Sequence, residues 1–156
     1  EAALLSLLRQ DFPHVSAERL LSGSGLVLLY QAVCRLQGVA ALALHPAQVS
    51  EAALQQTNVQ CQRAVHLFTG FLGSVAGNLA LTLGALGGVY VGGGIVPKLG
   101  HAFDEALFRR RFEAKGRYRD YLSEIPVWVI TAQTPALLGA SYALDLRGCK
   151  AGDAIR

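Results

Sequence analysis

Methionine is absent from the 156-residue chain, which begins at Glu1. Translation starts with a methionine, and the first residues show none of the pattern of a secretory signal peptide. We therefore expect the chain to be a segment of a longer protein, with part of the function encoded before Glu1.

Cysteine is scarce, and its three positions are Cys34, Cys61 and Cys149. Their scattered spacing fits neither a disulfide framework nor a zinc site, so we interpret them as reduced thiols of a cytoplasmic protein. The four histidines show no metal-ligand spacing either, and no Ser-His-Asp or Cys-His arrangement can be assembled with specificity. We expect no metal site within this chain.

Charged residues make up 16% of the chain and hydrophobic residues 52%, with a net charge of +3. A disordered chain needs low hydrophobicity and high net charge, so this composition excludes a disordered chain.

One basic cluster occurs within residues 109–119: Arg109, Arg110, Arg111, Lys115, Arg117 and Arg119. Contact with nucleic acid or phosphate is one interpretation. A solvated helix face is favoured, because aromatic residues recur there at core-like spacing and acidic residues lie nearby; the aromatic residues are Phe108, Phe112, Tyr118 and Tyr121.

No Asp, Glu, Lys or Arg occurs from Ala64 to Pro97. A stretch of this length could cross a bilayer. Glycines and polar side chains interrupt it, however, so we predict a buried helix followed by a buried strand and no membrane contact. The helix is expected over about 59–83 with Asn58 as its cap, and the strand over 88–91.

Two stripes run along the predicted long helix. The apolar stripe consists of Cys61, Val65, Phe68, Leu72, Val75, Leu79 and Leu83, and the small-residue stripe of Gly70, Gly73, Gly77, Ala80 and Gly84. Because a glycine inside a helix costs about 1 kcal/mol relative to alanine, the small stripe needs a compensation. We expect another element to approach it closely, which makes this helix central and covered on both sides.

The remaining pattern predicts helices over 1–12, 26–36, 48–56 and 135–146, a charged helical region over 98–122 and a second buried strand over 125–131. Two strands separated by a helical crossover indicate an α/β fold with a parallel pair. Two strands make a poor sheet alone, so we expect further strands before Glu1. Residues 147–156 are interpreted as a tail.

A glycine turn, Gly92-Gly93-Gly94, connects the first predicted strand to the helix that Ile95, Val96 and Pro97 begin. Glycines after a strand allow a ligand to approach the backbone, and ligands of open α/β sheets bind at the carboxyl ends of strands. The spacing is neither a dinucleotide fingerprint nor a Walker loop. A nucleotide site and a tight corner without any ligand are equally compatible with the turn alone.

Glu18 lies between Ser16 and the turn Ser22-Gly23-Ser24-Gly25. A carboxylate held near such a turn can accept two hydrogen bonds from a sugar diol. By itself the position favours an ordinary surface carboxylate, because most glutamates are solvated.

Taken together, several segments resemble bacterial glucokinase of the hexokinase and actin-like ATPase superfamily. They are His14-Val15-Ser16-Ala17-Glu18-Arg19-Leu20-Leu21-Ser22-Gly23-Ser24-Gly25-Leu26, Gly77-Asn78-Leu79-Ala80-Leu81, the run from Gly87 to Pro97, Phe112-Glu113-Ala114-Lys115-Gly116-Arg117 and Pro135-Ala136-Leu137-Leu138-Gly139-Ala140. Their order and spacing are similar to the family over about residues 1–142. Departures from the family pattern are Thr134 in place of an asparagine and Ser24 in place of a frequent proline.

The resemblance implies that residues 1–146 are the C-terminal portion of the glucokinase large domain, a helix-rich part of an actin-like (ribonuclease H-like) ATPase domain with an incomplete sheet. It implies that Glu18 binds glucose hydroxyls and that Gly92, Gly93 and Gly94 bind the adenosine of ATP. The family's phosphate loop, its Asn-Asp pair with the catalytic base and its sugar-binding Glu-Gly-Gly-His segment do not occur in the chain.

The implied activity is phosphorylation of glucose at O6 with ATP and Mg²⁺, by a cytoplasmic homodimer that binds neither nucleic acid nor membrane. No catalytic residue is assigned to this chain, and the chain alone is expected to be inactive. The alternative is a non-catalytic sugar-sensing domain of a sugar-responsive repressor, which a helix-turn-helix segment before Glu1 would favour.

Overall fold

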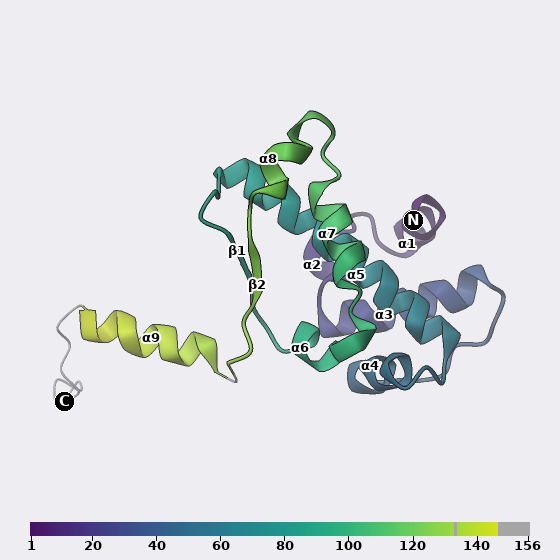
Figure 1. Ribbon diagram of the computed structural model, residues 1–156. Helices are drawn as coiled ribbons and strands as arrows, with labels where there is room; N and C mark the ends of the chain where they lie inside the picture. The colour runs from purple at the N-terminus through teal and green to yellow at the C-terminus, as the bar shows by residue number, and fades with distance from the viewer. Residues whose placement is uncertain (133, 147–156) are drawn as a thin grey trace.

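The computed structural model describes residues 1–132 and 134–146, in which a group of helices packs against a pair of strands (Figure 1). In chain order the elements are α1 (Ala2–Asp11), α2 (Ala17–Leu20), α3 (Gly23–Leu36), α4 (Pro46–Leu54), α5 (Val59–Leu83), β1 (Val89–Val91), α6 (Ile95–Leu99), α7 (Glu105–Glu113), α8 (Arg119–Ser123), β2 (Val127–Val129) and α9 (Pro135–Leu146). Short 3-10 turns at Gly100–Ala102 and Gly116–Tyr118 flank α7. The predicted helix-rich α/β fold is confirmed, while the predicted tail and Cys149 lie outside the described residues.

The long helix α5 has the bounds that its sequence predicts. The Asn58 side chain accepts a hydrogen bond from the Cys61 backbone N–H at 2.9 Å, which caps the first turn. Gly84 ends the helix in the left-handed conformation, with φ of 61°. Gly84 therefore terminates α5 and does not belong to the small-residue stripe inside the helix.

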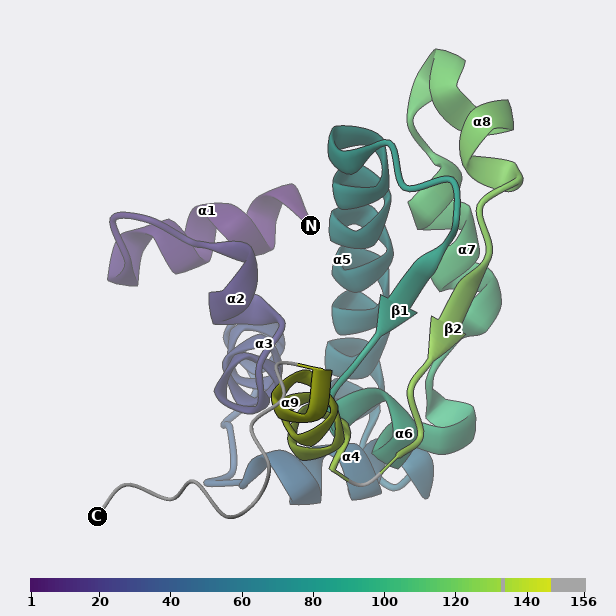
Figure 2. The same cartoon turned by 90° about the vertical axis from the view of Figure 1, so that its left-hand side faces the viewer.

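Helix α7 packs directly against the small-residue stripe of α5 (Figures 1 and 2). A Cβ atom at Gly73 would overlap the carbonyl oxygen of Phe108, and one at Gly77 would overlap that of Phe112. Lys115, just after α7, donates from its Nζ to the backbone oxygen of Ser74 at 3.0 Å. The close approach that the glycines predict is thus made by the backbone of α7.

Two apolar clusters contact α5, the larger along its first half and the smaller nearer its C-terminal end. The larger cluster joins α5 to α1, α3 and α4 and contains the fully buried Tyr30 and Phe68. The smaller cluster joins α5 to α7 and α8 around Phe112, Leu122 and Ile125. By length and composition α5 could cross a membrane, but half of its apolar window is buried by these neighbours.

The apolar stripe predicted for α5 is only partly internal. Leu79 and Leu83, at its C-terminal end, are 53% and 75% exposed. At this end Ala76 and Ala80 are buried against α7 and α8 while the side of Leu79 and Leu83 is uncovered in the described residues, so the prediction that α5 is covered on both sides is wrong there. Tyr118, which was expected to pack at a core-like position, is also exposed, because it lies on a 3-10 turn beyond the end of α7.

The strands β1 and β2 run parallel, with Val89 opposite Val127 and Val91 opposite Val129. Helices α5 and α7 lie behind the pair in Figure 2. On the other face the rings of Tyr90 and Trp128 stack with their centroids 4.9 Å apart and remain 66% and 43% exposed. The prediction of two buried strands is therefore wrong for this outer face, because the described helices cover only one side of the sheet.

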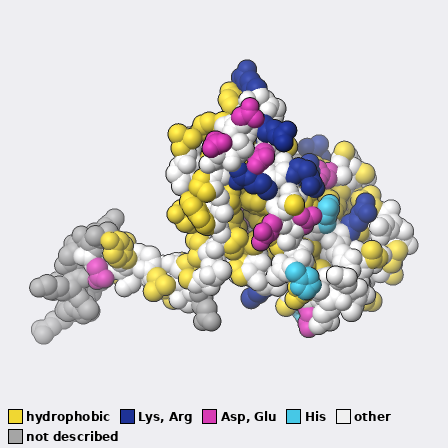
Figure 3. Space-filling model, viewed as in Figure 1, with side chains coloured by type: hydrophobic (Ala, Val, Ile, Leu, Met, Phe, Trp, Pro, Cys, Tyr) yellow, Lys and Arg dark blue, Asp and Glu magenta, His cyan; other side chains and the backbone are white. Residues whose placement is uncertain are grey.

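The basic cluster is largely engaged in contacts within the fold. Arg109 donates to the carbonyl oxygens of Leu122, Ser123 and Ile125, which ties α7 to α8. Burial, and then the nearby charge of Arg111, lowers the pKa of Lys115. Figure 3 shows acidic side chains interleaved with Lys and Arg over this part of the surface.

Replacement of Gly73 or Gly77 by alanine is expected to destabilise the fold by about 2 kcal/mol or more, because the added methyl group overlaps a carbonyl oxygen of α7. Gly70→Ala is the matched control on the same stripe, since its Cβ would meet only the ends of two flexible side chains, Arg111 at 3.4 Å and Glu1 at 3.7 Å. That variant should be neutral or more stable, as alanine favours helices. Urea unfolding followed by circular dichroism measures the difference, and equal effects of all three substitutions would contradict the close approach.

Candidate functional site

Two serines begin two consecutive helices around Glu18. The Ser16 hydroxyl oxygen accepts a hydrogen bond from the Arg19 backbone N–H at 3.1 Å, which caps α2. The Ser22 hydroxyl oxygen accepts one from the Gly25 backbone N–H at 3.1 Å, which caps α3. Glu18 lies in the first turn of α2, where a carboxylate interacts favourably with the helix dipole.

Gly25 allows α2 and α3 to approach each other closely. A Cβ atom at this position would overlap the carbonyl oxygens of Arg19 and Leu20, so the first turn of α3 rests on the last turn of α2. The short contact fixes the position of Glu18 relative to Ser22 and the residues that follow it.

The exposed Glu18 carboxylate borders a hollow of about 360 Å³. Its polar lining residues also include Ser22, Ser24 and Gln31, and the two serine hydroxyl oxygens are 3.1 Å apart. Among the described residues no ion pair or side-chain hydrogen bond engages Glu18. A carboxylate that only accepts, beside hydroxyl and amide groups that both donate and accept, suits a ligand rich in hydroxyl groups.

The glycine turn lies exposed between the end of β1 and the start of α6. Gly93 has φ of 106°, a conformation that L side chains rarely adopt. A Cβ atom at Gly92 would reach only Ile130, at 3.6 Å, and one at Gly94 only Lys98, at 3.8 Å. The backbone therefore requires glycine at 93, whereas at 92 and 94 the missing side chains leave the surface above the turn open.

A pocket of about 670 Å³ lies beside this turn, between the start of α3, helix α4 and helix α6. Its apolar walls include Leu26, Leu54 and Ile95, and its charged groups are Glu51 and Lys98. The complete lining is Gly23, Leu26, His45, Pro46, Ala47, Ser50, Glu51, Leu54, Gly94, Ile95 and Lys98. Apolar walls with a few polar groups are typical of pockets that bind small organic ligands.

The start of α3 borders both cavities. Gly23 lines the pocket beside the glycine turn, and Ser22 and Ser24 line the hollow of Glu18. The structure thus places Glu18 and Gly94 in two separate cavities on either side of one helix start. The sequence order alone does not predict this arrangement.

Sequence reasoning missed the contribution of α4. Five of its residues line the pocket: Pro46 at its first position, and Ala47, Ser50, Glu51 and Leu54, which follow one another at spacings of three, one and three. These spacings place them on one helix face, which was the available signal. His45, which precedes α4, donates from its backbone N–H to the Gln48 side chain at 2.8 Å.

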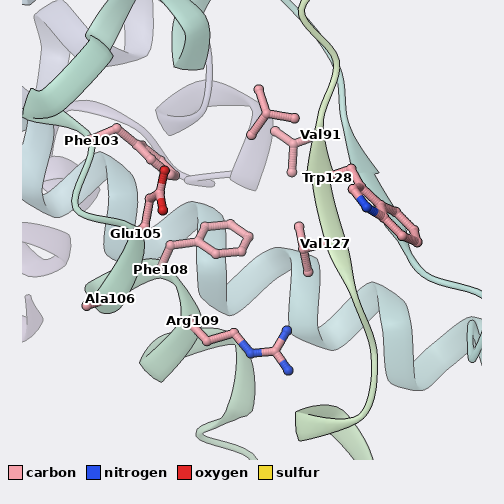
Figure 4. A pocket seen from close by; sticks show the side chains of 9 residues that line it. Val91, Phe103, Glu105, Ala106, Phe108, Arg109, Val127 and Trp128 are labelled. Carbon is pink, nitrogen blue, oxygen red and sulfur yellow. The ribbon is translucent and has the colours of Figure 1, made fainter.

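A further pocket of about 610 Å³ lies between α7 and β2 and contains none of the predicted site residues (Figure 4). Phe108 and Val127 point into it, while the Trp128 ring turns away to the outer face of the strand. Arg109 borders this pocket, but its guanidinium already donates to backbone oxygens of α8 and the segment after it. The Arg109 guanidinium is therefore less available to a ligand than the Lys98 ammonium beside the glycine turn, which makes no hydrogen bond or ion pair within the described residues.

The comparisons with known proteins all match this chain to the same family. The Glucokinase family model matches residues 1–147. The glucokinase of Aromatoleum aromaticum is 57% identical over 145 residues, covering 93% of this chain and 44% of the relative. The glucokinase of Chromobacterium violaceum is 56% identical over 133 residues, covering 85% and 38%.

A solved structure agrees with these sequence matches. The crystal structure of glucokinase from an Antarctic psychrotroph superimposes with a TM-score of 0.84 at 39% identity, covering 93% of this chain and 45% of that one. The fold is therefore part of the predicted ATPase fold, with an incomplete sheet. The chain spans less than half the length of these relatives.

Gly25→Ala is expected to destabilise the protein by about 2 kcal/mol or more, since the new methyl group must separate α2 from α3. Gly23→Ala is the matched control two residues earlier, where the Cβ would meet Pro46 at an ordinary 3.6 Å. Thermal unfolding compares the two variants. A control that unfolds as early as Gly25→Ala would show that the α2–α3 contact is not the cause.

Proposed function

The chain belongs to the glucokinase family, and on that basis we propose that the full-length protein containing it transfers the γ-phosphoryl group of ATP to O6 of glucose. The observation that carries the proposal is the family match over residues 1–147. The two cavities at the start of α3 support it, because one offers groups for a polyol and the other an apolar pocket beside a glycine turn.

Glu18 is the proposed sugar-orienting residue. Its carboxylate accepts hydrogen bonds from glucose hydroxyls, and such charge-assisted bonds are stronger than those between neutral groups. Ser16 and Gly25 support this role indirectly, since the cap and the short helix contact hold α2 in place. A site built on hydroxyl recognition rejects analogues that lack the hydroxyl, because its polar groups would then remain unpaired.

Gly92, Gly93 and Gly94 are the proposed adenosine-binding residues, together with the pocket beside them. The open surface at Gly92 and Gly94 lets a ligand approach the backbone, and the apolar side chains of Leu26, Leu54 and Ile95 can contact the faces of a purine ring.

No catalytic residue is assigned to this chain. Asp11 pairs with Arg35, Asp104 caps α7, and no described aspartate lines either cavity. The described residues also lack any group of three His, Cys, Asp or Glu side chains that could hold a metal ion, so no residue here is assigned to Mg²⁺. The base that accepts the proton of the glucose 6-hydroxyl is therefore proposed to come from the remainder of the full-length protein.

Family membership also supports further proposals for the full-length protein. We expect a cytoplasmic homodimer that uses ATP with Mg²⁺, in which residues 1–146 form the C-terminal portion of the large domain.

Glu18→Gln in the full-length protein is expected to raise the KM for glucose about 10- to 100-fold, because an uncharged amide accepts weaker hydrogen bonds. The KM for ATP should change little, since Glu18 does not line the pocket beside the glycine turn. Steady-state kinetics with each substrate varied measures both constants. Glu124→Gln is the control, an exposed glutamate that lines neither cavity, and equal effects of Glu18→Gln on both KM values would remove Glu18 from the sugar site.

The 156-residue chain by itself is expected to produce no glucose 6-phosphate. A coupled assay with glucose-6-phosphate dehydrogenase compares it with the full-length protein at equal concentration. Turnover by the chain alone would contradict the assignment of the catalytic base to another segment. Glucose binding without turnover by the full-length protein would favour the sugar-sensing alternative.

A further inference from the structure

Lys98 occupies a specific position relative to the glycine turn. It lies one helical turn after Gly94 on α6, and its side chain extends back toward that residue. A Cβ atom placed on Gly94 would lie 3.8 Å from the Lys98 Cε and 3.9 Å from its Nζ. The ammonium group therefore stands over the open side of the turn and borders the pocket of about 670 Å³.

The Lys98 ammonium has no partner in the part of the chain that the structure describes. Several other basic side chains do have one: Arg35 pairs with Asp11, Arg109 with Glu113, and Lys115 donates to the Ser74 carbonyl oxygen. Lys98 thus differs from the basic residues that stabilise the fold.

Glu51 borders the same pocket from α4, yet no ion pair joins it to Lys98 within the described residues. Its carboxylate accepts a hydrogen bond from the Gln55 side chain at 3.0 Å instead. The pocket consequently presents one group that only donates and one that only accepts, and neither neutralises the other.

We propose that Lys98 binds the nucleotide in this pocket, its Nζ donating a hydrogen bond to an acceptor atom of the nucleotide beside Gly94. The inference rests on the proposed function, which places a nucleotide here, and adds a side chain to a site otherwise described by glycines. The shared chemistry is a hydrogen-bond acceptor, which can be a phosphate oxygen or an atom of the nucleoside. Lys98 takes no part in bond making and acts by positioning the nucleotide.

The test compares Lys98→Met with Lys98→Arg in the full-length protein. Methionine keeps most of the length and apolar volume of the side chain but removes the donor, so the KM for ATP should rise about 10- to 100-fold while the KM for glucose stays unchanged. Arginine should restore most of the affinity for ATP. Arg110→Met is the matched control, because Arg110 is an exposed basic residue that borders none of the cavities described above.

Calorimetric titration with ATP, ADP and adenosine distinguishes the two sources of the acceptor. An equal loss of affinity for all three with Lys98→Met identifies a contact to the nucleoside, and a loss for ATP and ADP alone identifies a contact to phosphate. Affinities that match those of Arg110→Met, or a wild-type protein that binds no nucleotide, overturn the inference. A wild-type protein that binds ATP but does not phosphorylate glucose contradicts the proposed function alone, and the titrations then still decide the role of Lys98.

Discussion

The backbone of α7 lies against α5 closely enough that two glycines of α5 have no room for a side chain. This contact between Gly73, Gly77 and the carbonyl oxygens of Phe108 and Phe112 sets the position of α7 on α5. Because α7 is held there, the crossover from β1 to β2 runs along α5, and the two strands pair in parallel beside it. The contact between α5 and α7 therefore also constrains the position of the glycine turn at the end of β1.

A second close contact organises the other half of the site. Gly25 allows α3 to begin directly on the end of α2, and the serine caps satisfy backbone donors that the two helix starts would otherwise leave unpaired. As a result Glu18 and the glycine turn lie on either side of one helix start, although they are far apart in the sequence. Rigid backbone contacts, more than side-chain interactions, position the candidate binding groups.

The chain combines an ordered helical core with an uncovered sheet face. Tyr90 and Trp128 stack on each other in solvent, and the sheet contains two strands in the described residues. The relatives that match the chain are more than twice as long as the matched part. Within such a protein this chain contributes the two cavities at the start of α3, while no aspartate among the described residues lines either of them.

Local sequence determined most of the secondary structure and the family. The cap at Asn58, the left-handed glycine after α5 and the bounds of α9 follow from short-range physics, as does the expectation that the glycine stripe receives another element. The roles of Glu18 and Gly92–Gly94 were predicted only through the family resemblance, because the turn alone is equally compatible with a corner without any ligand and Glu18 alone favours a surface carboxylate. Tertiary structure alone decided which element fills the stripe, which face of each strand stays exposed, and that α4 and Lys98 border the pocket beside the turn. These outcomes depend on how distant segments pack, and periodicity along one segment carries no information about the partner that it will meet.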